Sequence, residues 1–188
     1  TADTTAVTAK VGQRYVFDTF VEIYECWEAF VSFTNSLSAA DTVTGVTFSL
    51  RGSTDNSVDN FTIRLRQYNW GPSVTTADWR AAPAETLLAT FATSGWTTGG
   101  YNNFTQQGAF AGAVTKGGTD YWALSSSQQE ANVAPTIDEY VSFSTAEATG
   151  TTSDPQITLT YTTTHTGQAA LPGRASLAAS GAVVVGTS

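Results

Sequence analysis

The chain has little sulfur and little imidazole: its 188 residues include one cysteine, no methionine and one histidine. A lone cysteine excludes an intrachain disulfide and a cysteine-rich metal site. Cys26 follows Tyr24 and Glu25 and precedes Trp27, an aromatic setting in which a thiol packs as a small hydrophobe. We therefore expect Cys26 to be buried, and an intermolecular disulfide or a reactive thiol is the alternative.

Basic residues are also few. Eight Lys and Arg against sixteen Asp and Glu give a net charge of −8, and charged residues make up only 13% of the chain. Binding of nucleic acid requires a clustered basic surface that neutralises phosphates, so we expect no nucleic-acid partner. Arg64 and Arg66 come closest to a cluster, and their spacing of two predicts a solvated outer face of a strand.

Long hydrophobic runs are absent as well. No apolar segment approaches the length that crosses a bilayer and no signal peptide is visible, so we expect no membrane partner. The chain begins at Thr1 without a methionine. This start fits a processed N-terminus and equally an initiator methionine trimmed before a small residue.

The acid–base groups that hydrolases need are missing or poorly placed. His165, the only imidazole, follows the last clear strand in a Thr-rich run, and we expect it in a solvated tail. Glu22, Glu25 and Glu28 are the densest carboxylates, but spacings of three put Glu25 on the opposite strand face from the other two. We expect no enzyme activity and no cofactor, with Ca²⁺ as the one alternative left open.

What the sequence does contain is the alternation of apolar and polar residues that half-buried strands show. Residues 139–161 indicate a strand, a small polar loop closed by Asp154 and Pro155, and a second strand. Proline is acceptable as the first residue of a strand, and an aspartate before it favours an extended backbone. The same period predicts strands at about 15–24, 27–34, 43–51, 61–67, 86–93, 109–114 and 121–125.

About nine such strands separated by turn signals, without a long helix, predict an all-β fold: a two-sheet antiparallel β-sandwich. Jelly-roll topology is favoured, and an immunoglobulin-like sandwich is the alternative. We expect residues 12–163 to form this domain, between an N-terminal arm (1–11) and a C-terminal arm or linker (164–188). A short helix is predicted to start after Thr75, with Asp78 three residues on completing its cap.

The C-terminal segment differs in composition from the rest. After residue 163 it is rich in Ala and Gly and contains no aromatic or acidic residue, so it can add little to a core. A flexible linker is one interpretation. The other is an interface arm, in which Ala182, Val183, Val184 and Val185 add a strand to an exposed edge of a neighbouring subunit.

A calcium site is a candidate in the segment 52–60, which is rich in turn residues. Asp55 and Asp59 could supply the loop oxygens that Ca²⁺ prefers. Ordinary turn residues explain the same pattern equally well.

A glycan site is a second candidate, in the irregular middle of the chain where binding loops tend to lie. Trp96 and Tyr101 carry flat apolar rings that could stack on the apolar face of a sugar ring. Trp70 and Trp79 lie in the same region, and for them we favour closure of the core at one end of the sandwich.

Four segments, taken in order, resemble a family of jelly-roll modules. They are EAFVSFTNS at 28–36, TVTGVTFSL at 42–50, TIRLRQYNWGPSVTTADW at 62–79 and the strand–loop–strand at 139–161. The pattern is similar to DNRLRE-type, TGF-β-propeptide-like modules encoded in structural genes of tailed bacteriophages. The resemblance covers about residues 13–163 and depends on strand and turn residues, since the literal motif that names the family is absent.

The resemblance implies a non-enzymatic structural component of a tailed-bacteriophage virion, exposed on the particle surface as a capsid decoration, tail or fibre protein. It implies a homo-oligomer, such as a trimer, and contact with the major capsid or tail protein. The protein would be made in the host cytoplasm and lie on the particle exterior, which suits an acidic chain. A secreted carbohydrate-binding or adhesin module that binds a cell-surface glycan is the alternative.

Overall fold

A computed structural model of the chain describes residues 5–80, 83–165 and 177–186. Most of its regular structure is β-strand, interrupted by short helical turns. The elements in chain order are β1 (Thr8–Asp18), β2 (Val21–Trp27), β3 (Ala29–Thr34), β4 (Asp41–Ser57), β5 (Thr62–Gln67), η1 (Thr76–Asp78), β6 (Leu87–Ala92), η2 (Thr93–Gly95), β7 (Tyr101–Asn103), β8 (Thr105–Gln106), α1 (Phe110–Ala113), β9 (Thr119–Ser126), α2 (Ser127–Glu130), β10 (Glu139–Ser144), β11 (Gln156–His165) and β12 (Leu177–Gly186).

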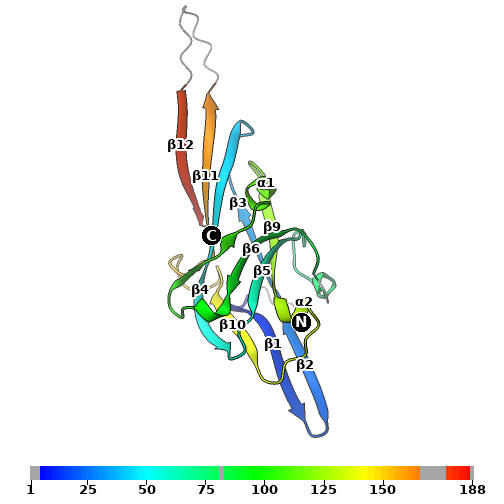
Figure 1. Ribbon diagram of the computed structural model, residues 1–188. Helices are drawn as coiled ribbons and strands as arrows, with labels where there is room; N and C mark the ends of the chain where they lie inside the picture. Colours follow the sequence, from blue (N-terminus) through cyan, green and yellow to red (C-terminus); the bar gives the residue numbers. More distant parts are fainter. Residues whose placement is uncertain (1–4, 81–82, 166–176, 187–188) are drawn as a thin grey trace, which may run out of the picture.

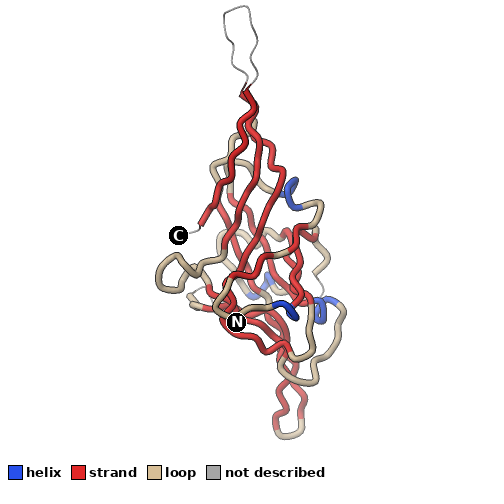
Figure 2. Tube along the Cα trace, turned by 60° about the vertical axis from the view of Figure 1, so that its left-hand side comes forward, coloured by secondary structure: helices blue, strands red, loops and turns tan. Residues whose placement is uncertain are grey.

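Two antiparallel sheets make up the molecule, which confirms the predicted all-β sandwich. One sheet has the order β12-β11-β4-β10-β1-β2, with β7 also paired to β4, and the other has the order β3-β9-β5-β6-β8. The β1–β2 hairpin projects from one end of the body and the β11–β12 pair from the other (Figure 1). Figure 2 shows the same elongated outline from a second direction. The jelly-roll topology stays a prediction.

The core lies between the sheets and is built from the residues that alternate inward along the strands. On β4 the predicted inward residues Val46, Phe48 and Leu50 are at most 4% exposed. On β5 the inward residues Ile63 and Leu65 are fully buried. Each such side chain contributes roughly 1.5–3 kcal/mol when it leaves water, so the alternation read from the sequence is also the main source of stability.

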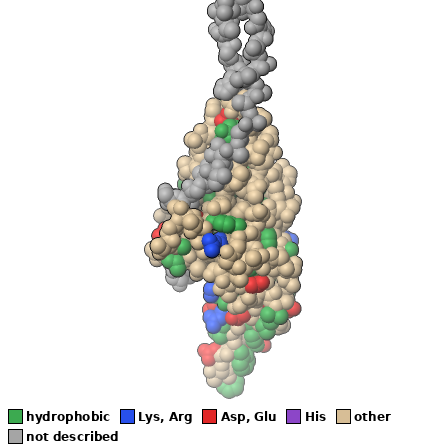
Figure 3. All heavy atoms as spheres, turned by 90° about the vertical axis from the view of Figure 1, so that its left-hand side faces the viewer, with side chains coloured by type: hydrophobic (Ala, Val, Ile, Leu, Met, Phe, Trp, Pro, Cys, Tyr) green, Lys and Arg blue, Asp and Glu red, His purple; other side chains and the backbone are tan. Residues whose placement is uncertain are grey.

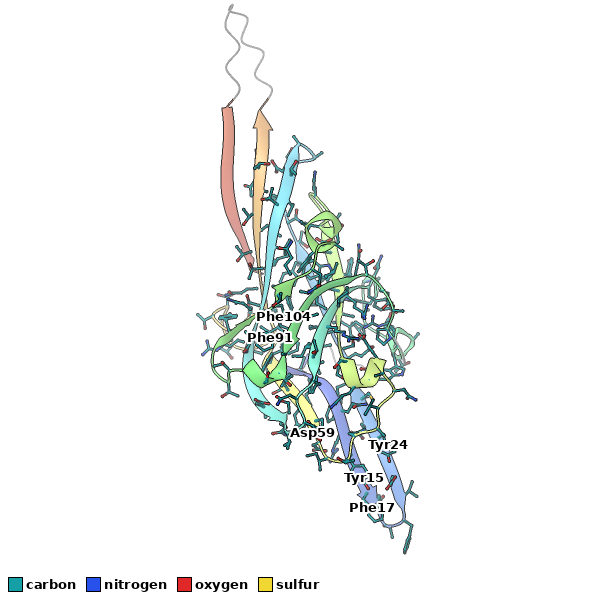
Figure 4. The ribbon with its side chains drawn as sticks, in the orientation of Figure 1. Tyr15, Phe17, Tyr24, Asp59, Phe91 and Phe104 are labelled. Carbon is teal, nitrogen blue, oxygen red and sulfur yellow. The ribbon has the colours of Figure 1, made fainter. Side chains whose placement is uncertain are left out.

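Aromatic rings fill the centre of this core. Trp122 on β9 contacts Phe33 at 5.2 Å and Phe110 at 5.0 Å between ring centroids, and Phe48 contacts Phe104 at 5.0 Å. Most of these pairs meet edge to face, the arrangement that the charge distribution of the rings favours. Figure 4 places Phe104 inside the body, beside Phe91 of β6.

The N-terminal arm expected over residues 1–11 is shorter in the structure, because β1 begins at Thr8. Alternation is broken at Gly12, where φ is +136° and Val11 and Gln13 on either side are both buried. A Cβ atom at residue 12 would lie 2.2 Å from the carbonyl oxygen of Glu139, so only glycine fits this close strand crossing. Because consecutive residues are buried here, the alternation that predicts a strand is missing near the start of β1.

Two further segments differ from the prediction. Residues 52–57, expected in a loop, continue β4 because they pair with β10, and this pairing overrides the local turn propensity. Residues 109–114, expected as a strand, contain the helical turn α1. There Phe110 and Val114 are the buried residues, and a spacing of four is the spacing of one helix face.

The helix start predicted at Thr75 is confirmed as a single 3-10 turn, η1. The Ala77 amide donates to the Thr75 hydroxyl oxygen at 3.2 Å, and the Thr75 amide donates to the Asp78 carboxylate at 2.7 Å. Both halves of this capping box are set by residues close in sequence, which explains why it could be read from the sequence.

Arg64 and Arg66 are only partly solvated, with side chains 34% and 11% exposed, which differs from the predicted solvated face. Both guanidinium groups bind the Glu130 carboxylate, whose side chain is only 6% exposed, and the Arg66 contact is 2.8 Å. The Ser125 hydroxyl donates to the same carboxylate at 2.7 Å. Burial acts to raise the pKa of Glu130, but the hydrogen bonds from Arg66, Ser125 and Arg64 outweigh it and lower the pKa to about 2.

The burial of three residues, Cys26, Trp70 and Trp79, is lower than a position in the core would give. Cys26 is only half-buried, because β2 is an edge strand, and its Sγ accepts a hydrogen bond from Gln13 Nε2 at 3.6 Å. Trp70 is half-buried and packs edge-on against Tyr121, with ring centroids 5.0 Å apart. Trp79 is 46% exposed, so its predicted role in closing the core is wrong.

Candidate functional site

The hairpin of β1 and β2 stands apart from the core. Its strands pair up to Asp18 opposite Val21, and Thr19 and Phe20 make the turn. The Phe20 amide donates to the Asp18 carbonyl oxygen at 2.6 Å, the Thr19 hydroxyl donates to the Asp18 carboxylate at 2.8 Å, and Thr19 has a positive φ of 53°. The chain thus reverses without the Gly or Asn of the usual two-residue turns. Because the chain reverses at Thr19 and Phe20, the single strand predicted over 15–24 is wrong.

Apolar side chains are concentrated near this turn. Ten large hydrophobic side chains are exposed among the described residues, and five of them lie within residues 17–24. Phe20 is 91% exposed, Phe17 63% and Val21 60%. Hydrophobic side chains gather at this end of the molecule in Figure 3, and Figure 4 places Phe17 and Tyr24 along the projecting strands. Soluble proteins seldom keep such a patch unless it makes a contact.

The strand register makes both faces of the hairpin apolar. Residues directly opposite in an antiparallel pair share a face, so Tyr15 joins Tyr24 on one side while Val16 joins Ile23 on the other. A strand pair that covers a core normally keeps one face polar. Here neither face near the tip covers the body, and both are available to a partner.

A small polar network holds the aromatic rings of one face in place. Glu22 accepts hydrogen bonds from the hydroxyl groups of Tyr24 at 2.6 Å and Tyr15 at 3.3 Å, and the two rings are 5.8 Å apart. The hydrogen bond to Glu22 raises the pKa of Tyr24 above its ordinary value. Fixing the rings before contact lowers the entropy cost of binding.

The base of the hairpin is braced by the segment between α2 and β10. The Tyr15 amide donates to the Asp138 carboxylate at 3.2 Å, and Gln13 Nε2 donates to the Val133 carbonyl oxygen at 3.0 Å. Arg14 lies 3.5 Å from Glu25 across the two strands. These contacts hold the hairpin at a defined angle to the body, so the tip presents a positioned surface.

The side chains of this site are suited to apolar contacts with a partner. Residues 15–24 contain no Lys, Arg, His or Cys, and their charges are those of Asp18 and Glu22. In the part of the chain that the structure describes, no three His, Cys, Asp or Glu side chains gather as a metal site. The tip therefore offers apolar area bordered by negative charge.

The predicted glycan residues Trp96 and Tyr101 do not form an exposed platform. Trp96 is 8% exposed and meets Phe91 edge to face at 5.6 Å, and its indole lies so close to Gly52 that a Cβ there would be 2.9 Å from Nε1. The Tyr101 hydroxyl is within hydrogen-bond distance of the Asp154 carbonyl oxygen at 2.9 Å. Both residues fix loops, so the exposure predicted for Trp96 is wrong.

The predicted calcium residues also have structural roles. Asp55 lies within β4, and its carboxylate accepts hydrogen bonds from the amide and the hydroxyl of Ser57 at 3.0 and 2.6 Å. Asp59 donates its amide to the carboxylate of Glu139, which is 2% exposed. Asp55 is thus a strand residue and Asp59 follows the end of the strand, and no site of three acidic groups surrounds them in the described residues.

The predicted interface arm, Ala182, Val183, Val184 and Val185, lies in β12. This strand pairs antiparallel with β11 of the same chain, from Gln156 opposite Gly186 to His165 opposite Leu177. This segment therefore adds as a strand within its own chain, and its addition to a neighbouring subunit stays a prediction. The partner strand was available because β11 would otherwise be an edge of its sheet.

The apolar hairpin tip is a candidate functional surface that the sequence prediction missed. One signal was present: residues 15–24 are apolar at both odd and even positions, which a half-buried strand does not need. Among the described residues, no helix has the length and apolar character needed to cross a membrane. Comparisons of the chain with protein-family models, with curated proteins and with solved structures gave no match.

Proposed function

We propose that this protein is a non-enzymatic structural component of a tailed-bacteriophage virion, attached to the particle through its β1–β2 hairpin. The observation that carries the proposal is the hairpin tip, where half of the exposed large hydrophobic side chains of the described residues gather within residues 17–24. An apolar surface on a rigid projection is suited to insertion between subunits of a larger assembly. Residues such as Phe17 and Phe20 are the anchors that such interfaces use.

The charge of the tip supports a protein partner over a lipid surface. Asp18 and Glu22 are its only charged residues, and anionic lipid headgroups would repel them. The partner is accordingly the major capsid or tail protein of the same particle, with an apolar pocket and a polar or basic rim. The net charge of −8 keeps the body soluble on the particle exterior, away from the packaged nucleic acid.

The experiment is mass photometry of the purified chain, alone and mixed with the purified shell and tail proteins of its source. We expect a stable complex with one of these proteins, in which each virion site is occupied by a homo-oligomer of this chain. Replacing Phe20 with Ser should weaken the complex by about tenfold or more, because a central aromatic anchor is lost.

Val58→Ser is the matched control, since Val58 is 70% exposed and lies outside the hairpin. It should leave binding unchanged. Both variants should keep the circular dichroism spectrum and melting temperature of the parent. A complex that is equally stable with Phe20→Ser, or no complex with either class of protein, would overturn the proposal.

A further inference from the structure

A groove of about 1240 Å³ opens on the molecule away from the hairpin tip, since no residue of 15–24 lines it. Its longest wall is the continuous segment 25–33, which contains the end of β2, Glu28 and most of β3. Small-molecule sites are typically about 300–1000 Å³. The groove is therefore large for a metabolite and has room for a segment of a polymer.

The edge of β3 faces this groove. Successive side chains of a strand point to opposite faces of its sheet. Nevertheless the buried Val31 and Phe33 and the less buried Phe30 and Ser32 between them all line the groove. A groove over one face would be lined by alternate residues only. Since β3 is the last strand of its sheet and pairs, among the described residues, with β9 alone, its unpaired backbone groups border the groove.

The other walls come from segments outside β3. They are the start of β1, residues 145–147, and the loop 70–76 with Trp79. Because the β3 edge lies within a groove, a second folded sheet would have to displace these walls to reach it. One extended segment needs only the width of a single strand, about 4.8 Å in the pairing direction. Strand addition of this kind obtains affinity from main-chain hydrogen bonds and specificity from alternate side-chain pockets.

The aromatic residues of the groove favour a peptide over a glycan. Trp27 is engaged by the Lys10 ammonium, 4.6 Å from its ring centroid, and by Tyr140 in a T-shaped contact with ring centroids 5.0 Å apart. Trp70 packs against Tyr121, so Trp79 is the one tryptophan of the groove that is largely exposed. Stacking of a sugar chain would need several free ring faces, whereas one exposed indole is enough to cover a peptide side chain.

The charges of the groove define the peptide further. Its acidic residues are Glu25, Glu28 and Glu147, and its basic residue is Lys10, which is engaged with two aromatic rings. Glu28 is neutralised by Arg80 at 3.2 Å. Glu25 is exposed and lies 3.5 Å from Arg14, whereas no ion pair is found for the exposed Glu147 among the described residues. A segment with a Lys or Arg beside its apolar residues would complement the Glu147 carboxylate and the net negative charge of the groove.

We propose that this groove binds an extended peptide segment of a partner protein, which adds as a strand to the free edge of β3. The segment carries apolar side chains at alternate positions and at least one basic residue. This site is separate from the hairpin tip, and its binding does not depend on the function proposed above. It would allow the protein to hold a flexible arm of a neighbour while the tip docks elsewhere.

The test is selection of binders to the full chain from a library of random twelve-residue peptides displayed on beads. We expect selected sequences with alternating apolar residues and a basic residue. Hydrogen exchange with the synthetic winner should slow the amides of residues 29–34. Every second backbone N–H of the bound peptide would point toward β3. Methylating these nitrogens should weaken binding by about tenfold or more, and methylating the nitrogens between them should not.

Protein variants separate this site from the hairpin. Ser73→Trp places a bulky ring in the groove and should abolish peptide binding, whereas Ser53→Trp, an exposed residue of β4 that does not line the groove, should not. Phe20→Ser should also leave peptide binding intact. No selected peptide, binding without protection of β3, or equal tolerance of both methylation registers would overturn the proposal. So would binding of oligosaccharides that depends on Trp79 and leaves the β3 amides unprotected.

Discussion

The hairpin and the body contain the same kinds of side chain in opposite surroundings. Phe48 in β4 is fully buried among aromatic rings, whereas Phe20 at the hairpin turn is 91% exposed. Glu130 in the body is 6% exposed and bound by two arginines, whereas Glu22 in the hairpin is exposed and contacts tyrosine hydroxyl groups. The difference teaches that an aromatic residue or a carboxylate in this sequence stabilises the fold only where long-range pairing encloses it.

Phe48→Ala should have the largest effect on stability. The substitution leaves a cavity beside Phe33 and Phe104, and buried Phe-to-Ala changes cost about 3–5 kcal/mol. We expect a large drop of the urea midpoint with an unchanged slope of the unfolding transition. A loss below about 1 kcal/mol would mean that the aromatic centre is not the main core.

Glu130→Gln should have the next largest effect. The amide keeps the size of the side chain but removes the charge that pairs with Arg64 and Arg66, and we expect a loss of about 2 kcal/mol. Glu22→Gln is the matched change in the hairpin, and it should alter the free energy of unfolding by less than about 0.5 kcal/mol. Equal losses in the two variants would remove the contrast between the regions.

The pH dependence of Glu130→Gln tests the buried side of this contrast. The folded pKa of Glu130, about 2, lies below its ordinary value of 4.5, so its carboxylate stabilises the folded state above pH 4.5. This contribution is lost as the pH falls from 4.5 to about 2. The difference in melting temperature between the parent and Glu130→Gln should therefore shrink over this interval.

Phe20→Ala should have the smallest effect. The side chain is 91% exposed and covers no core, so we expect the free energy of unfolding to change by less than about 0.5 kcal/mol. Urea denaturation beside Phe48→Ala measures the contrast directly, because the same atoms are removed at both sites. A loss comparable with that of Phe48→Ala would show that the hairpin tip packs on the body.

Features set by neighbours in sequence could be predicted, and those set by distant pairing could not. The inward positions of β4 and β5 and the cap at Thr75 follow from local alternation and from residues three apart. The burial of Trp96 depends on Gly52 and Phe91, which only the folded sheets bring together. The hairpin was missed because Thr19 and Phe20 are not residues that usually mark a turn.

The connection of β2 to β3 gives the hairpin a mechanical consequence. One continuous stretch, 21–34, leaves the hairpin and changes sheet at Glu28, which Arg80 and Gln129 hold in place. A pull on the tip along its strands would load both sheets at once. On the β1 side, the force acts along the strand and is shared by all six residue pairs between β1 and β10. Such a shear force cannot break the pairs one after another. A subunit attached by this tip would resist axial tension far better than a sideways peel.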